Sequence, residues 1–450
     1  MRFFLRQQKM RPKKFIKSSR IPQNKIPPNK SPLFILQKIR YNFFMRILRR
    51  YLIGIALGIL AALILPFENS QWNVALSFVT EIIVRIGRYT LMPLLFFSGI
   101  TAMRRLRSDK LLTQTSILTF AVIIASSILL ALLGFISIVI VRNFPHIPIT
   151  TEHANEIASL DIQDLLRTIF PYSAFSALDN GTFLLPTFLF AMVVGAGCCI
   201  HQSNLKPMLS LLDCASELFY NISTVFVEFF SMGFFFLTCA WTVQFKSIIK
   251  SGIFLPLIVM LSVEFIVVVG LIYPLIIKFT CRNGKPLKIL YASIVPFLVA
   301  FFSGDTNLAL SSEIQMGNEN LGIKQRTSGF SFPLFSIFAR GGNALVIIIS
   351  FVMILHSYSD LNIELSSLLF ISVTAFALSF LLGGIPVGGT FTALTILCTI
   401  YGRGMENGFL LFMPAAAIIG SFAALFDAAT AMFGCYIVAH NTKATETRRP

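Results

Sequence analysis

The chain has 450 residues, of which 55% are hydrophobic and 13% are charged, and its formal net charge is +17. An average soluble domain has about 25% charged residues, so this composition excludes an ordinary water-soluble protein. It indicates an integral membrane protein, because a chain surrounded by lipid can leave this much apolar surface uncovered by polar groups.

The positive charge is concentrated in an N-terminal tail. Residues 1–50 contain 15 Lys or Arg and no acid, whereas basic and acidic groups nearly balance in the rest of the chain. We expect residues 1–46 to be a disordered cytoplasmic tail, or sequence read from a start codon assigned too early. Attraction to anionic lipid is the alternative, functional interpretation. Nucleic acid is not an expected partner, and the tail does not resemble a secretory signal.

Apolar runs predict six membrane-spanning helices in the first part of the chain, at about residues 48–66, 78–102, 112–141, 183–202, 207–244 and 251–279. About 20 apolar residues span the hydrocarbon core of a bilayer. Basic residues favour the cytoplasmic side, so Arg104–Arg107 predicts an inside loop and the acidic segment after the third helix an outside one. Both termini are expected in the cytoplasm. Only Lys246 and Lys250 go against this topology.

The pattern changes after residue 285. Ile289–Phe302 is apolar but too short to span the membrane, and it stops at Ser303–Asn307. This predicts a hairpin that enters and leaves by the same side. Leu368–Leu382 and Thr390–Tyr401, separated by the glycine-rich Gly383–Gly389, predict a second re-entrant hairpin that enters from the other side.

Two further helices complete the predicted fold, one at 324–355 that is interrupted by Ala339–Asn343 and a last one at about 407–440. The expected fold class is an all-α membrane protein with eight transmembrane helices and two re-entrant helical hairpins. Two hairpins of opposite entry around a broken helix suggest an inverted repeat. Apolar segments interrupted by Gly and Pro are typical of the binding sites of secondary transporters.

Three charged residues lie inside these apolar segments, namely Asp305, Arg340 and Asp427. A charge at the centre of a bilayer costs about 2.5–3.5 kcal/mol on insertion scales, so each needs a reason. In the functional interpretation, Arg340 binds an anionic group of a solute and the two acids form a cation or proton site. In the structural alternative, Arg340 pairs with Asp305 or Asp427 and neutralises it. The sequence leaves both open.

Residues around the interruptions form the predicted substrate site. The glycines around Pro386 would expose backbone N–H and C=O groups that bind a carboxylate or a cation, although a plain tight turn is the alternative. The predicted substrate-binding residues are Asp305, Thr306, Asn307, Arg340, Asn343, Pro386, Val387, Gly388, Gly389, Asp427 and Thr430. A cation site is expected near Asn343 and Asp427. We predict no catalytic residue, no metal-ligand cluster and no cofactor, and hence no enzyme.

Three stretches resemble one known family. They are Ile83–Ala102, Ile169–Val194 and Gly384–Leu397, with the Gly-Ile-Pro-x-x-Gly element at 384–389. From about residue 46 to 440 the chain resembles the dicarboxylate/amino acid:cation symporters, the family of glutamate transporter homologues.

The resemblance implies a homotrimer in the plasma membrane, the inner membrane in bacteria, that works by an elevator-like shift. Residues 47–282 would be mainly scaffold, with part of the transport core, and residues 283–440 the rest of that core. Residues 441–450 would form a cytoplasmic tail. The substrate would be a small anionic or zwitterionic solute, an amino acid or dicarboxylate, coupled to Na⁺ or H⁺.

Departures from the family pattern concern the site. Asp305–Asn307 replaces a serine-rich tip, and Ala339–Asn343 replaces Asn-Met-Asp-Gly-Thr, so an Asp and an Asn used for Na⁺ are missing. Ala429 stands where the family has a substrate-binding Arg, while Asp427 and Thr430 match. We therefore expect a divergent symporter with Arg340 as a relocated substrate anchor. The alternatives are a non-transporting homologue with a structural Asp–Arg pair, and a channel-like one.

Overall fold

The computed structural model describes residues 32–65, 70–141, 167, 170–179, 183–200, 205–282, 284–358, 364–381 and 389–445. The chain divides into two units, Met1–Met45 and Arg46–Pro450. All contacts discussed below lie within the larger unit. Pro386, Val387 and Gly388 of the predicted site lie outside the described residues.

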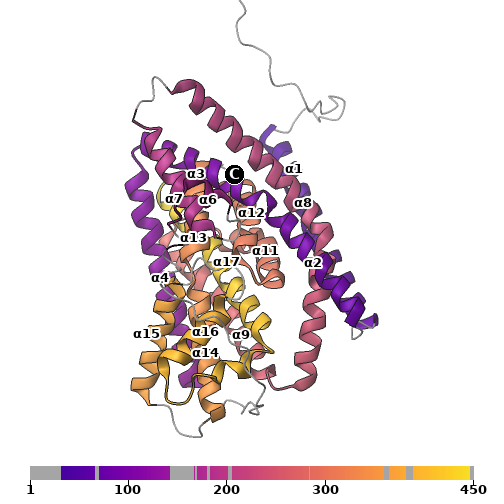
Figure 1. Cartoon of the computed structure of the whole chain (residues 1–450). Helices are drawn as coiled ribbons and strands as arrows, with labels where there is room; N and C mark the ends of the chain where they lie inside the picture. The colour runs from indigo at the N-terminus through magenta and orange to yellow at the C-terminus, as the bar shows by residue number, and fades with distance from the viewer. Residues whose placement is uncertain are drawn as a thin grey trace, which may run out of the picture. The chain divides into compact units, whose positions relative to one another are not determined.

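The described chain is helical (Figure 1). Its first half contains α1 (Pro32–Ile64), α2 (Ser70–Tyr89), α3 (Leu91–Ser108), α4 (Leu112–Ile140), α6 (Ala174–Asp179), α7 (Leu184–Gly197), α8 (Lys206–Ser251), α9 (Leu255–Val267), the π-helix η2 (Val268–Ile272) and α10 (Tyr273–Thr280). Its second half contains α11 (Pro286–Ser303), α12 (Thr306–Met316), the π-helix η3 (Gly317–Leu321), α13 (Gln325–Phe338), α14 (Gly341–Tyr358), α15 (Leu365–Leu381), α16 (Gly389–Tyr401), the 3₁₀-helix η4 (Gly408–Phe412) and α17 (Ala416–Asn441). An isolated β-bridge joins Ile323 and Thr445.

Eight helical segments among the described residues are long and apolar enough to cross a membrane. The number agrees with the prediction, but the members differ. The predicted fourth helix has only 14 residues, because it ends at Gly197. In its place Pro286–Ser303 reaches 18 residues. The predicted arm of the first hairpin is thus longer than its apolar run indicated.

Prolines explain two other differences from the predicted helices. The predicted helix 78–102 is broken at Thr90, between α2 and α3, because Pro93 has no N–H to donate to the carbonyl of Tyr89. The π-helix η2 ends at Ile272, two residues before Pro274, and Tyr273 N–H bonds to Val268 O, one residue beyond the α-helical spacing. The last helix begins at Ala416 instead of 407, after η4.

The turn between α11 and α12 lies where the first hairpin was predicted. Gly304 has φ +62°, a left-handed conformation that glycine adopts without steric cost. Asp305 then begins α12 by accepting a hydrogen bond from Asn307 N at 2.9 Å. Since α11 and α12 pack against each other, the two helices form a helical hairpin.

Burial separates the C-terminal helices from the first ones. In their most apolar stretches, Gln325–Tyr358 and Ala416–Asn441 are 89% and 83% buried, against 33% for Met45–Ile64 and Leu112–Ile140. The broken helix α13–α14 and α17 therefore form the centre of the larger unit. The outward apolar faces of α1 and α4 are suited to lipid or to a partner subunit.

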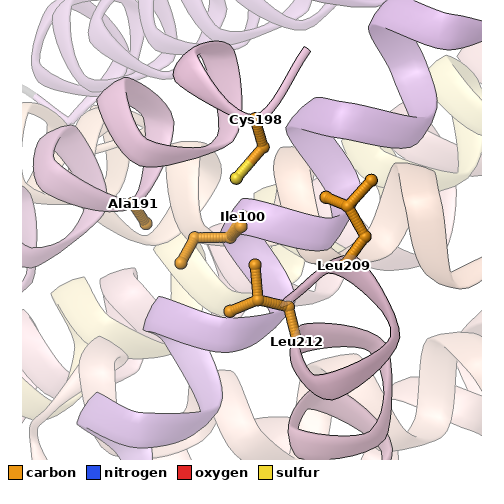
Figure 2. Close-up of a cluster of buried hydrophobic side chains, with 5 residues drawn as sticks. All are labelled: Ile100, Ala191, Cys198, Leu209 and Leu212. Carbon is orange, nitrogen blue, oxygen red and sulfur yellow. The ribbon is translucent and has the colours of Figure 1, made fainter. Parts of the chain in front are cut away.

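A cluster of buried hydrophobic side chains joins α3, α7 and α8. Its side chains gather between the three helices in Figure 2, and they are Ile100, Ala191, Cys198, Leu209 and Leu212. One turn beyond Ile100, Arg104 donates to both carboxylate oxygens of Asp213 at 2.6 Å. The cluster thus fixes the end of α3 against the start of α8.

Candidate functional site

Four parts of the chain meet through buried polar side chains. They are the start of α12, the junction of α13 and α14, the first turn of α16 and the middle of α17. Three of these are the interrupted segments that the sequence analysis singled out. Helix ends carry backbone groups without partners in their own helix, so such a junction can bind polar solutes and ions.

The carboxylate of Asp427 on α17 sits at the N-terminus of α14. It is fully buried and accepts hydrogen bonds from Gly342 N at 2.8 Å and from Asn343 Nδ2 at 2.7 Å. A negative charge is favourable at a helix N-terminus. The approach requires glycine, because a Cβ on Gly342 would lie 2.5 Å from Phe426 Cβ and 2.7 Å from Asp427 Oδ1.

Arg340 occupies the break between α13 and α14. Its side chain is buried, and Nη1 donates to the Thr306 hydroxyl at 3.0 Å. The same nitrogen lies 3.7 Å from Asp427 Oδ2, which is an ion-pair distance but too long for a hydrogen bond. The predicted pairing with Asp427 is therefore present in a loose form, and Thr306 holds the guanidinium.

Asp305 has a different partner from the one predicted. Arg88, at the end of α2, donates to Asp305 Oδ2 from Nε at 3.0 Å and from Nη2 at 2.5 Å. Pairing of Arg340 with Asp305 was therefore wrong. Arg88 was not among the predicted site residues, although it lies in an apolar segment and the rule that selected Arg340 applies to it as well.

Asn343 connects α17 to the second predicted hairpin. Its amide nitrogen donates to Asp427, while its oxygen Oδ1 accepts from the Thr390 hydroxyl at 2.5 Å. Thr390 follows Gly389, the first residue of α16. A chain of hydrogen bonds thus runs from α16 through α14 to α17, and Thr390 is a further residue that the sequence analysis missed.

Two predicted residues lie in contacts of their own. Asn307 Oδ1 accepts from the Ser336 hydroxyl on α13 at 3.1 Å, which ties the start of α12 to α13. The Thr430 hydroxyl shares a 2.6 Å hydrogen bond with the Tyr273 hydroxyl and donates to Phe426 O. The hydrogen bonds of Thr430 therefore connect α17 to α10 and do not lead to Arg340.

Glu313 on α12 is a buried acid that the sequence analysis missed. It is 0% exposed, and neither carboxylate oxygen has a hydrogen-bond partner among the described residues. Arg340 and Asp427 both act on it electrostatically. The sequence could have indicated Glu313 as a candidate, because it is an acidic residue between two predicted membrane segments.

The sequence matches a known protein family over most of its length. A model described as the sodium:dicarboxylate symporter family matches residues 47–441. The chain belongs to this family. Family membership confirms the resemblance seen in the sequence. The family and the relatives described below are transporters, not enzymes.

Individual family members are distant. Neutral amino acid transporter A of Homo sapiens is 26% identical over 218 residues, which are 48% of this chain and 41% of that protein. The chain thus matches less than half the length of that relative. Excitatory amino acid transporter 3 of Bos taurus is 19% identical over 77% of this chain and 76% of its own. The putative sodium-dependent excitatory amino acid transporter glt-6 of Caenorhabditis elegans is 24% identical over 74% and 69%.

Proposed function

We propose that this family member is a symporter that carries a small anionic or zwitterionic solute, an amino acid or dicarboxylate, together with Na⁺ or H⁺. One observation carries the proposal. The buried guanidinium of Arg340 lies at the break of the central helix, 3.0 Å from Thr306 and 3.7 Å from Asp427.

Arg340 has the chemistry to anchor a carboxylate. A guanidinium offers five N–H donors in a planar fork, and Arg–carboxylate pairs are frequently bidentate. Asp427 accepts hydrogen bonds of 2.8 Å from Gly342 N and 2.7 Å from Asn343 Nδ2, whereas its Oδ2 lies 3.7 Å from Arg340 Nη1. A solute carboxylate that engages Arg340 need not break those two bonds. The names of the relatives, which are amino acid transporters, support the same substrate class.

The coupling cation would bind near Asn343 and Asp427. Both side chains offer oxygen atoms, and each carboxylate oxygen of Asp427 keeps a further lone pair after accepting one hydrogen bond. Carbonyl groups at the end of α13, where the helix stops at Phe338, lie on the same interruption. The family's description favours Na⁺ as the ion, and H⁺ is the alternative.

The wider architecture is part of the proposal. We infer that α11–α12 and α15–α16 are re-entrant hairpins, that residues 283–440 form most of a moving core, and that the chain works as a homotrimer in the plasma membrane or bacterial inner membrane with both termini in the cytoplasm. The contact between α11 and α12 and the exposed apolar side chains on α1, α4 and α9 support this arrangement.

Uptake by purified protein in proteoliposomes tests the proposal. A labelled panel of acidic amino acids, neutral amino acids and dicarboxylates is offered under a Na⁺ gradient and, separately, under a H⁺ gradient. We expect saturable uptake of an anionic or zwitterionic solute with one of the two gradients. Currents without saturable uptake would instead indicate a channel-like homologue.

Variants at Arg340 separate a substrate anchor from a structural ion pair. Arg340→Gln removes the charge, and Arg340→Gln with Asp427→Asn removes both charges while keeping an acceptor for Gly342 N–H. A purely structural pair predicts that Arg340→Gln damages folding and that the double variant regains it. The anchor role predicts that Arg340→Gln and the double variant are both folded but that neither binds an anionic solute. Binding is measured here because Asp427→Asn also removes the proposed cation ligand, which alone could abolish transport. Circular dichroism and gel filtration verify folding in each case.

A further inference from the structure

A cavity of about 420 Å³ opens between the end of α3 and the start of α13. It is lined by Arg104, Arg105, Ser108, Asp109, Lys324, Gln325 and Arg326. It lies at the opposite end of α13 from Arg340, about 21 Å away along a helix of this length. The cavity is therefore separate from the proposed substrate site.

The charges around the cavity do not cancel. Four lining residues are basic, and the acids near them are Asp109 in the lining and Asp213 behind it. Asp213 accepts from both Arg104 and Arg105, and Asp109 pairs with Arg326. This balance leaves two positive charges in excess.

Two observations show that the donors of the cavity exceed its acceptors. The Nε–H groups of Arg104 and Arg326 are buried and have no hydrogen-bond partner among the described residues. The side chain of Lys324 has no ion pair with a described residue. The backbone N–H of Lys324 bonds to Ala444 O. A buried donor without an acceptor is costly, so an added anion would be stabilised here.

The start of α13 adds to the positive potential. Lys324 is the residue before the helix, and no side chain caps the first turn. The free backbone N–H groups of a helix N-terminus favour anions, phosphate above all. Gln325 and Arg326, in that first turn, line the cavity.

We propose that this cavity binds a phosphate group. The group carries one to two negative charges and several acceptor oxygens, which match the excess charge and the unfilled donors. Its source is either the head group of an anionic phospholipid or a soluble phosphate compound. The Arg-rich end of α3 is predicted to be cytoplasmic, so both sources would reach it from the inner side.

Thermal unfolding of the purified full-length chain tests the site. The apparent melting temperature is measured in inorganic phosphate against chloride at equal ionic strength, and in phosphatidylglycerol against phosphatidylcholine vesicles. Lys324→Ala removes a side chain that pairs with no described acid. Lys278→Ala, an exposed cation at the end of α10 that does not line the cavity, is the matched control.

We expect a saturable stabilisation of the wild type. The half-saturating concentration should be about fivefold higher for Lys324→Ala and unchanged for Lys278→Ala. Stabilisation by phosphatidylglycerol alone identifies a lipid head group, and stabilisation by inorganic phosphate identifies a soluble anion. The site is wrong if neither probe stabilises the wild type, or if both lysine variants respond alike. These outcomes do not depend on the transported solute.

Discussion

The backbone N–H of Gly342 donates a 2.8 Å hydrogen bond to Asp427, 85 residues further along the chain. The last helix thereby supplies the cap for the second half of the broken helix. This contact fixes the start of α14 beside Arg340, and it depends on the absence of a side chain at position 342.

Gly342→Ala is expected to destabilise the protein by about 1–3 kcal/mol, the usual cost of overpacking a buried site. The new methyl would overlap Phe426 and the Asp427 carboxylate, both closer than 3 Å. Gly420→Ala on α17 is the matched control, because a Cβ there meets nothing within 4 Å. It should be neutral, or stabilising by up to about 1 kcal/mol through helix propensity. Equal melting temperatures for the two variants would contradict the role of Gly342.

The pair Arg88–Asp305 should show energetic coupling. Asp305→Asn keeps a side chain that can cap α12 but removes the charge, and Arg88→Gln removes the other partner. We expect a coupling energy of about 0.5–3 kcal/mol in a double-mutant cycle followed by thermal unfolding. Additive effects of the two substitutions would show that the pair contributes nothing to stability.

Thr390→Val tests the hydrogen bonds between α16 and the broken helix. Valine has nearly the shape of threonine but no hydroxyl, so Asn343 Oδ1 loses its donor, at a cost of about 1–3 kcal/mol. Thr395→Val is the control, since among the described residues the Thr395 hydroxyl bonds only to Phe391 O within α16. A lower melting temperature for Thr390→Val alone is expected. If uptake follows the proposed function, Thr390→Val should also raise the KM for the solute.

Glu313→Gln should leave the protein at least as stable as the wild type. The Glu313 carboxylate has no hydrogen-bond partner among the described residues, and an ionised carboxylate costs more to bury than the isosteric amide, whose own burial costs about 1–3 kcal/mol. Thermal unfolding measures the change. A clear loss of stability would mean that attraction between Glu313 and Arg340 outweighs the cost of burial. Loss of uptake from a stable Glu313→Gln variant would instead place Glu313 in the transport cycle.

Local signals in the sequence were sufficient for the interrupted segments. Glycines and charges inside apolar runs located the turn at Gly304, the break at Arg340 and the residues Asn343 and Asp427, and the structure brings these residues of α14 and α17 together. Such signals are readable because each depends on neighbours along the chain, where a charge or a glycine conflicts with a continuous membrane helix.

The partners of these residues could not be predicted in the same way. Arg88 and Asp305 are 217 residues apart, and nothing local to either residue specifies the other. The helix was predicted to continue across Thr90. This concealed that Arg88 lies in the last turn of α2, next to an interruption of the helix. Thr390 was passed over because threonine is common in membrane helices and its partner is again distant in sequence.

The length of α8 has a consequence for the membrane around the protein. Its 46 residues extend about 69 Å, more than twice the ~30 Å thickness of the hydrocarbon core. An upright helix of this length would project far into water on one or both sides, whereas a tilted one would keep more of its residues in the bilayer. A tilted helix adapts to a thinner or thicker bilayer by changing its tilt angle, without breaking its backbone hydrogen bonds. We therefore expect acyl-chain length to change the tilt of α8 and, through the contacts of α8 with α2 and α3, to act on the helices beside the site.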